Sequence, residues 1–161
     1  MLMYYLIEFV LLILLYHGVQ RLWLRVSGNP YGPWFRSVRG YKYQTTVEMS
    51  FNTPFRPPHI LASSHEWIYL FPSGCLTIKK GYCWDGPSGP TIDTVAFLMG
   101  SLPHDAFYQM SREGVIEGEE AREMADDTMR TVCLKAGMSR FRAWYCWKGV
   151  RLFAGRAARP S

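Results

Sequence analysis

The chain has 161 residues, four cysteines and a net charge of +5. This length predicts one domain, and a hydrophobic share of 48% is enough for a buried core. A charge of this size, without a long basic run, argues against a nucleic-acid partner. The cysteines show neither a CxxC pair nor a zinc spacing, which favours free thiols over a disulfide framework.

Residues 1–25 are expected to form a helix that anchors the chain in a membrane. The apolar run Phe9–Tyr16 is unbroken, and the segment through Leu24 reaches the ~20 residues that a bilayer helix needs. Arginines follow the segment and no Lys or Arg precedes it, so the positive-inside rule predicts a single-pass protein with its C-terminal domain in the cytoplasm. The alternatives are a buried helix or an oligomer interface. The expected partners are therefore the lipid membrane and, through this helix, a second copy of the chain.

Residues 26–40 are rich in turn-forming residues and predict a linker, which leaves residues 41–161 for the folded domain. The stretch 41–51 predicts a strand from its Thr, Val and aromatic residues. Two further runs, 65–71 and 75–78, are separated by a Pro-Ser-Gly turn and predict a β-hairpin.

Helical signals begin near Ile92. A Gly-Ser pair and Pro103 predict that this first helix is kinked or that a fresh helix starts at the proline. Residues 119–135 predict a second helix closed by Gly137, and Ser139 is expected to cap a last one. The fold class is therefore α+β, with a small antiparallel sheet followed by a half built from antiparallel helices.

The helix that begins near Ile92 carries residues suited to acid/base chemistry. His104 and Tyr108 are four residues apart and lie on one helix face. If this helix packs antiparallel to the helix predicted over residues 119–135, Asp126 or Asp127 in the middle of the latter can reach His104. A carboxylate on one imidazole nitrogen fixes the tautomer and leaves the other nitrogen as a base. Such a pair can activate a water for attack on an ester.

A cation site is expected beside this pair. Asp105 lies about 100° further round the same helix. The glycine/proline loop at residues 81–90 carries Asp85 and can point carbonyl oxygens at a hard cation. These oxygen ligands suit calcium, so Asp105, Asp85 and the loop carbonyls predict a calcium site. A zinc site is disfavoured because no second histidine lies near His104 in the sequence.

These motifs carry two family resemblances. The stretch from the loop to Gly155 resembles an uncharacterised phage and prophage family of unknown function, which implies a phage setting and no particular activity. The shared motifs are Trp84-Asp85-Gly86-Pro87-Ser88-Gly89-Pro90, His104-Asp105-Ala106-Phe107-Tyr108, Ala125-Asp126, and Arg142-Ala143 with Val150-Arg151-Leu152-Phe153.

A His-Asp-x-x-Tyr motif followed about twenty residues later by an Asp is also similar to phospholipase A2. This resemblance implies that His104 is the general base and that Asp105 and the loop carbonyls bind calcium. It further implies that Asp126 orients the histidine and that Tyr108 supports it with a hydrogen bond.

The combined expectation is a phage-type, membrane-associated protein that hydrolyses lipid esters with calcium. The alternative is a non-enzymatic phage structural or membrane-interaction protein whose His-Asp network only holds the fold. The two differ in what surrounds His104. An enzyme needs an open cleft over the histidine, whereas a structural role predicts a buried ring with both nitrogens bonded.

Overall fold

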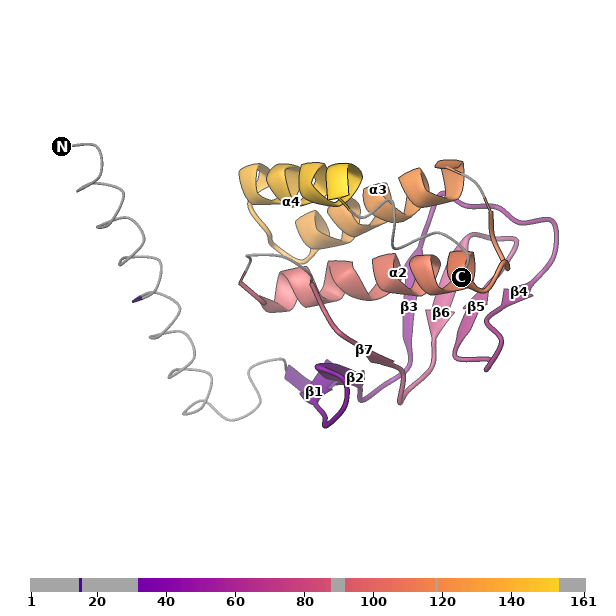
Figure 1. Cartoon of the computed structure of the whole chain (residues 1–161), viewed down its shortest axis with the longest axis horizontal. Coiled ribbons are helices and arrows are strands. Elements are labelled where there is room, and N and C mark those ends of the chain that lie inside the picture. The colour runs from indigo at the N-terminus through magenta and orange to yellow at the C-terminus, as the bar shows by residue number, and fades with distance from the viewer. Residues whose placement is uncertain (1–14, 16–31, 88–91, 118, 154–161) are drawn as a thin grey trace.

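The computed structural model describes residues 15, 32–87, 92–117 and 119–153. The membrane helix predicted over residues 1–25 lies outside these ranges except for Leu15. Among the residues so described, no helix combines the length and apolar character needed to cross a membrane. The described part of the chain is α+β, as predicted, with strands preceding helices (Figure 1).

The described strands form two antiparallel sheets rather than the single sheet expected. The first sheet has the order β1-β2-β7, built from β1 (Phe35–Ser37), β2 (Tyr43–Thr45) and β7 (Cys83–Trp84). The second has the order β3-β6-β5-β4, built from β3 (Met49–Asn52), β6 (Cys75–Ile78), β5 (Ile68–Leu70) and β4 (Leu61–Ala62).

The predicted hairpin is confirmed, because β5 pairs with β6 in antiparallel register across the Pro-Ser-Gly turn. The single strand expected over residues 41–51 is wrong, since the chain leaves the first sheet after Thr45 and enters the second at Met49. In the first sheet β2 pairs with β1 and β7, whereas in the second sheet β3 pairs with β6. Strand composition was recognisable, but pairing partners far along the chain decided where the strand divides.

Part of the predicted linker belongs to the first sheet. Phe35 opens β1, is fully buried and pairs with Thr45 of β2. Its ring meets the Trp84 ring edge-on with the centroids 5.2 Å apart. Because residues 26–40 are rich in turn-forming residues, the sequence did not predict this short strand, in which Phe35 is a core residue.

The second sheet turns its apolar side toward the helices. In β5 and β6 the residues that alternate along each strand, Ile68, Leu70, Leu76 and Ile78, are fully buried. They join Phe107 of helix α2 (Val95–Arg112) in one hydrophobic core. Figure 1 shows this helix lying between the strands and the other two helices.

The three described helices are α2 (Val95–Arg112), α3 (Glu119–Lys135) and α4 (Arg140–Phe153). Thr94 caps α2, with its side chain accepting from the Phe97 amide at 3.4 Å. Pro103 lies inside α2 and the helix continues through it, so a fresh start at the proline is wrong. The bounds of α3 match the prediction, and Gly137 follows it at φ +91°, as a C-terminal glycine should. The Ser139 side chain accepts from the Arg142 amide at 3.3 Å, which confirms the last cap.

The helices pack antiparallel in chain order, as Figure 1 shows. α2 and α3 approach each other closely at Gly100, where a Cβ would lie 2.8 Å from the Met129 carbonyl oxygen and would clash with the Cys133 sulfur. A glycine is needed here because the two backbones leave no room for a side chain. This close approach brings the middle of α2 against the middle of α3, where the candidate site lies.

Candidate functional site

The candidate site is a buried polar cluster between α2 and α3. His104 and Tyr108 project from the same face of α2, and their ring centroids are 4.2 Å apart. Both residues are buried, with 6% of His104 and 3% of Tyr108 exposed. Polar side chains at such positions need partners, because an unpaired buried polar group is costly.

Asp126 of α3 supplies that partner. Its Oδ1 lies 2.9 Å from His104 Nε2, so the predicted contact between the two residues is confirmed. The Tyr108 hydroxyl donates to the same oxygen at 3.1 Å. Asp126 is completely buried, and its carboxylate therefore depends on these donors and on nearby cations for its stability.

Two arginines that the sequence reasoning did not assign complete the surroundings of Asp126. Arg122 Nη1 lies 3.5 Å and Arg151 Nε 3.7 Å from the second carboxylate oxygen. Arg122 precedes Asp126 by one helical turn, and this spacing could have revealed it. Arg151 comes from α4, so its approach depends on how that helix packs and left no local signal in the sequence.

The neighbouring Asp127 does not bond to His104, although its Oδ1 lies 3.7 Å from Arg151 Nη2. Its side chain is 55% exposed and accepts from Trp147 Nε1 at 2.7 Å. The sequence left Asp126 and Asp127 open as partners of His104. The helix phase decides between them, because successive residues point about 100° apart and only Asp126 faces α2.

The second nitrogen of His104 is also bonded. Nδ1 lies 3.1 Å from Oδ1 of Asp105, the next residue on α2. The sequence had predicted a free nitrogen here, and the structure differs because Asp105 turns back toward the ring. The Asp105 side chain is 32% exposed, so it is the more accessible of the two carboxylates.

A histidine between two carboxylates favours its charged form. Burial opposes the charge, but the hydrogen bonds to Asp105 and Asp126 outweigh burial and raise the pKa of His104 to about 9. At neutral pH the ring is therefore an imidazolium that donates from both nitrogens. Burial and then the charge of Asp126 also raise the pKa of Tyr108, which keeps its hydroxyl a donor.

The calcium ligands expected from the sequence are not gathered into a recognisable site. Asp105 is occupied with His104, and Asp85 is exposed just after β7. In the described ranges no group of three or more His, Cys, Asp or Glu residues is placed to hold a metal ion. Calcium takes 6–8 oxygen ligands, so the described side chains do not by themselves fit the ion. Loop residues 88–91 lie outside the described residues, and calcium binding stays a prediction.

A second polar chain that the sequence reasoning missed runs along α2 one turn beyond Asp105. The Tyr82 hydroxyl donates to Gln109 Oε1 at 2.9 Å, and Gln109 Nε2 donates to Glu113 at 2.8 Å. Glu113 in turn accepts from the Ser64 amide at 2.7 Å. Burial first, and then the charge of Asp105, raise the pKa of Tyr82, so its hydroxyl stays neutral beside the candidate site.

Comparisons with protein-family models, with curated proteins and with solved structures find no match to this chain. The resemblances to a phage family and to phospholipase A2 therefore stay predictions that rest on sequence motifs alone.

Proposed function

We propose that this protein is a membrane-associated hydrolase of lipid esters in which His104 is the general base and Asp126 orients it. The observation that carries the proposal is the contact between His104 Nε2 and the fully buried Asp126 at 2.9 Å. A buried carboxylate on one nitrogen fixes the ring and its tautomer, and the other nitrogen, Nδ1, can act as a base once Asp105 leaves it. Membrane association rests on the apolar segment at residues 1–25, and a phage setting on the motif resemblance alone.

The other ring nitrogen, Nδ1, points to the more exposed side of the pair. Its only carboxylate partner in the described structure is Asp105, which is about one third exposed. The proposal requires Asp105 to rotate toward water, whereas Asp126 is held by Tyr108 and two arginines. The ring must also be neutral, which the raised pKa of about 9 places at alkaline pH. The neutral ring then keeps its Nε2–H on Asp126 and offers Nδ1 to a water molecule.

In the proposed reaction Nδ1 accepts a proton from water as the water oxygen bonds to the ester carbonyl carbon. The resulting imidazolium returns that proton to the alkoxide oxygen when the bond from carbon to the alcohol oxygen breaks. The products are a carboxylic acid and an alcohol, and the enzyme ends in its starting form. Asp126 stabilises the imidazolium between the two steps.

The test is fatty-acid release from phospholipid in mixed micelles by the full chain purified in nonionic detergent. We expect His104→Gln and Asp126→Asn to lower the rate by on the order of 10²- to 10⁴-fold, as for loss of a general base. Asp127→Asn is the matched control, because Asp127 is adjacent in sequence and also lies near Arg151 but bonds to Trp147 instead of His104. Circular dichroism reports whether each variant is folded.

Release by His104→Gln at the wild-type rate would overturn the role of the base. So would the absence of any release by the folded wild type over a range of phospholipid headgroups and short-chain esters. Loss of activity in Asp127→Asn equal to that in Asp126→Asn would show that the effect is not specific to the dyad.

A non-enzymatic, structural role is the second candidate, and a specific observation favours it. His104 is 6% exposed and both of its nitrogens face carboxylates. This is the buried, doubly bonded ring that a structural role predicts, so the enzymatic role requires Asp105 to move and open Nδ1 to water. If the role is structural, His104→Gln lowers the free energy of unfolding while no wild-type esterase activity exists to be lost. Measuring stability and hydrolysis on the same preparations separates the two roles.

A further inference from the structure

Helix α4 exposes a row of large apolar side chains. Phe141 is 74% and Leu152 73% exposed, and Trp144 and Tyr145 between them are also exposed. These positions repeat at the three- and four-residue spacing of one helix face. Lys148 occupies the same face, midway along the row, and is exposed as well. We call these five residues the aromatic face of α4.

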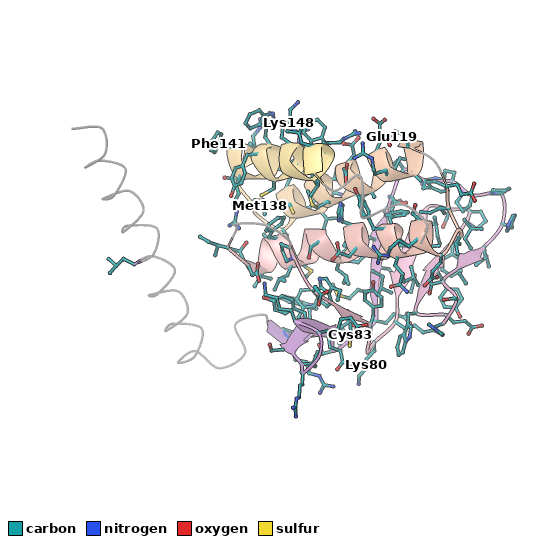
Figure 2. The ribbon with its side chains drawn as sticks, viewed as in Figure 1. Lys80, Cys83, Glu119, Met138, Phe141 and Lys148 are labelled. Carbon is teal, nitrogen blue, oxygen red and sulfur yellow. The ribbon has the colours of Figure 1, made fainter. Side chains whose placement is uncertain are left out.

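The opposite side of α4 is packed, so the helix is firmly placed on the molecule. Ala143 and Cys146 are buried in a hydrophobic cluster with Phe97 of α2 and Met129 of α3. The aromatic face is therefore not the core side of a displaced helix. Figure 2 shows Phe141 and Lys148 on the outer side of α4, away from α2.

Three rings of the aromatic face form one cluster. The Phe141 ring lies 6.1 Å from the Trp144 ring and 6.0 Å from the Tyr145 ring, between centroids. A contiguous exposed apolar patch on a folded protein marks a surface that contacts something else. Trp and Tyr combine an apolar ring with a polar tip, which suits a boundary between an apolar phase and water.

The charge on α4 is of one sign. The helix contains four basic residues and no acidic one. Arg142 and Arg151 turn inward, where they bind the Ile92 carbonyl and Glu123 respectively. Arg140 and Lys148 are exposed, so the outer side of α4 presents cations beside its aromatic rings.

We propose that the aromatic face of α4 docks on an anionic lipid surface, with the helix lying in the plane of the interface. Helices that bind this way place aromatic and leucine side chains at the acyl boundary and basic residues at the headgroups. Lys148 fits the arrangement because its long aliphatic stem can follow the apolar face while its ammonium group reaches a lipid phosphate. The docking is a second membrane contact, independent of residues 1–25 and of any catalysis at His104.

A second copy of the chain fits this face less well. Contacts between identical faces are usually related by a two-fold axis, and that axis brings the centre of a face near its own copy. Here the central residue is Lys148, so two such faces would place like charges together in a surface losing water. An anionic surface instead supplies the missing counter-charge.

The test measures burial of position 141 itself, because residues 1–25 could carry the whole protein to a membrane. The full chain, with the half-buried Cys75 and Cys83 changed to serine, is labelled with an environment-sensitive fluorophore at Phe141→Cys. Cys133 and Cys146 stay in place, since burial raises the pKa of both thiols, that of Cys133 to about 12, and makes them slow to react. Lys80→Cys is the control position, exposed and on the other side of the molecule (Figure 2).

The labelled protein is reconstituted with phosphatidylglycerol or with phosphatidylcholine. We expect a blue shift and several-fold weaker quenching by aqueous iodide at position 141 on phosphatidylglycerol. The effect should be reduced on phosphatidylcholine and at high salt, and position 80 should stay quenched throughout. Adding Lys148→Glu should restore quenching at position 141.

Three results would overturn the proposal. The first is a label at position 141 that stays fully quenched on phosphatidylglycerol. The second is protection that Lys148→Glu leaves unchanged. The third is protection that is equally strong on phosphatidylcholine and at high salt. Such protection means that something other than an anionic surface covers the face, a second copy if it rises with protein concentration.

Discussion

At the residue scale, His104 is the group whose charge decides what the cluster can do. Asp105 on its own helix and Asp126 on α3 face it directly, while Arg122 and Arg151 stand behind Asp126. Tyr108 remains neutral throughout the physiological range because burial raises its pKa. The ring is therefore held in its charged form by the two carboxylates against the cost of burial.

The raised pKa of His104 predicts a loss of stability at alkaline pH. The folded pKa of about 9 lies above the ordinary value of 6.5, so the stabilisation is fully present below pH 6.5. It disappears as pH rises from 6.5 through 9, because the folded state then loses the proton that it bound more tightly. The total is roughly 3 kcal/mol.

Unfolding of wild type and His104→Gln across this pH range measures the effect, with an NMR titration of the ring as a direct check. A wild-type slope that His104→Gln leaves unchanged would contradict the assignment. If His104 is also the base, hydrolysis should rise over the same window, since the neutral ring is the reactive form.

Asp126→Asn should destabilise the protein far more than Asp127→Asn. Removing the buried carboxylate leaves the charges of His104 and Arg122 poorly compensated, which typically costs about 3–5 kcal/mol. Asp127 is 55% exposed, and its loss should cost below about 1 kcal/mol. Chemical denaturation of the two variants makes the comparison, and equal losses would show that Asp126 is not the residue that holds the cluster.

Calcium binding through Asp105 is a separate prediction. Few carboxylates lie near Asp105 to share the ion, so we expect a calcium dissociation constant near the millimolar end of the range, about 10⁻⁴–10⁻³ M. Isothermal titration of the full chain in detergent should show heat that Asp105→Asn removes. An absence of heat at millimolar calcium, or equal heat from the variant, argues for a purely structural His-Asp pair.

At the scale of elements, the close packing of α2 against α3 positions the site. The pairs Gly100 with Met129 and His104 with Asp126 run in opposite directions along the two helices, as antiparallel packing requires. The site therefore depends on a contact one turn away from it. A helix displaced at Gly100 would also move His104 away from Asp126.

Gly100→Ala should destabilise the protein, whereas Gly149→Ala should not. A Cβ at position 100 meets the Met129 backbone oxygen at 2.8 Å, and forcing the helices apart typically costs about 1–3 kcal/mol. A Cβ on Gly149 of α4 meets nothing within 4 Å, so alanine there should be neutral or stabilising by up to about 1 kcal/mol. Thermal unfolding of the pair tests this, and a neutral Gly100→Ala would mean that the helices can separate freely at that point.

At the scale of the whole molecule, the expected membrane anchor and the aromatic face of α4 make two distinct predictions of membrane contact. Residues 1–25 should keep the full chain in the membrane pellet after alkaline carbonate extraction, because the run Phe9–Tyr16 is too apolar to be left in water. A full-length protein recovered as a soluble monomer would refute the anchor. The docking of α4 would remain to be judged by its own labelling experiment.

The sequence by itself determined the features that depend on neighbours along the chain. The bounds of α3, the Ser139 cap and the β5–β6 hairpin could all be predicted, because helix signals, caps and tight turns act over a few residues. The pairing of His104 with Asp126 was also within reach, since it needs only helical spacing and an antiparallel connection. Arg122 could have been found by the same spacing.

Only the tertiary structure decided which distant groups meet. The split of residues 41–51 between two sheets and the place of Phe35 in the core depend on strands far along the chain. Arg151 reaches Asp126 only because α4 packs on α3. The bond from His104 to Asp105 joins adjacent residues, yet helical spacing alone did not predict it. The charge of that histidine therefore follows from packing, because long-range packing sets the balance between desolvation and hydrogen bonding.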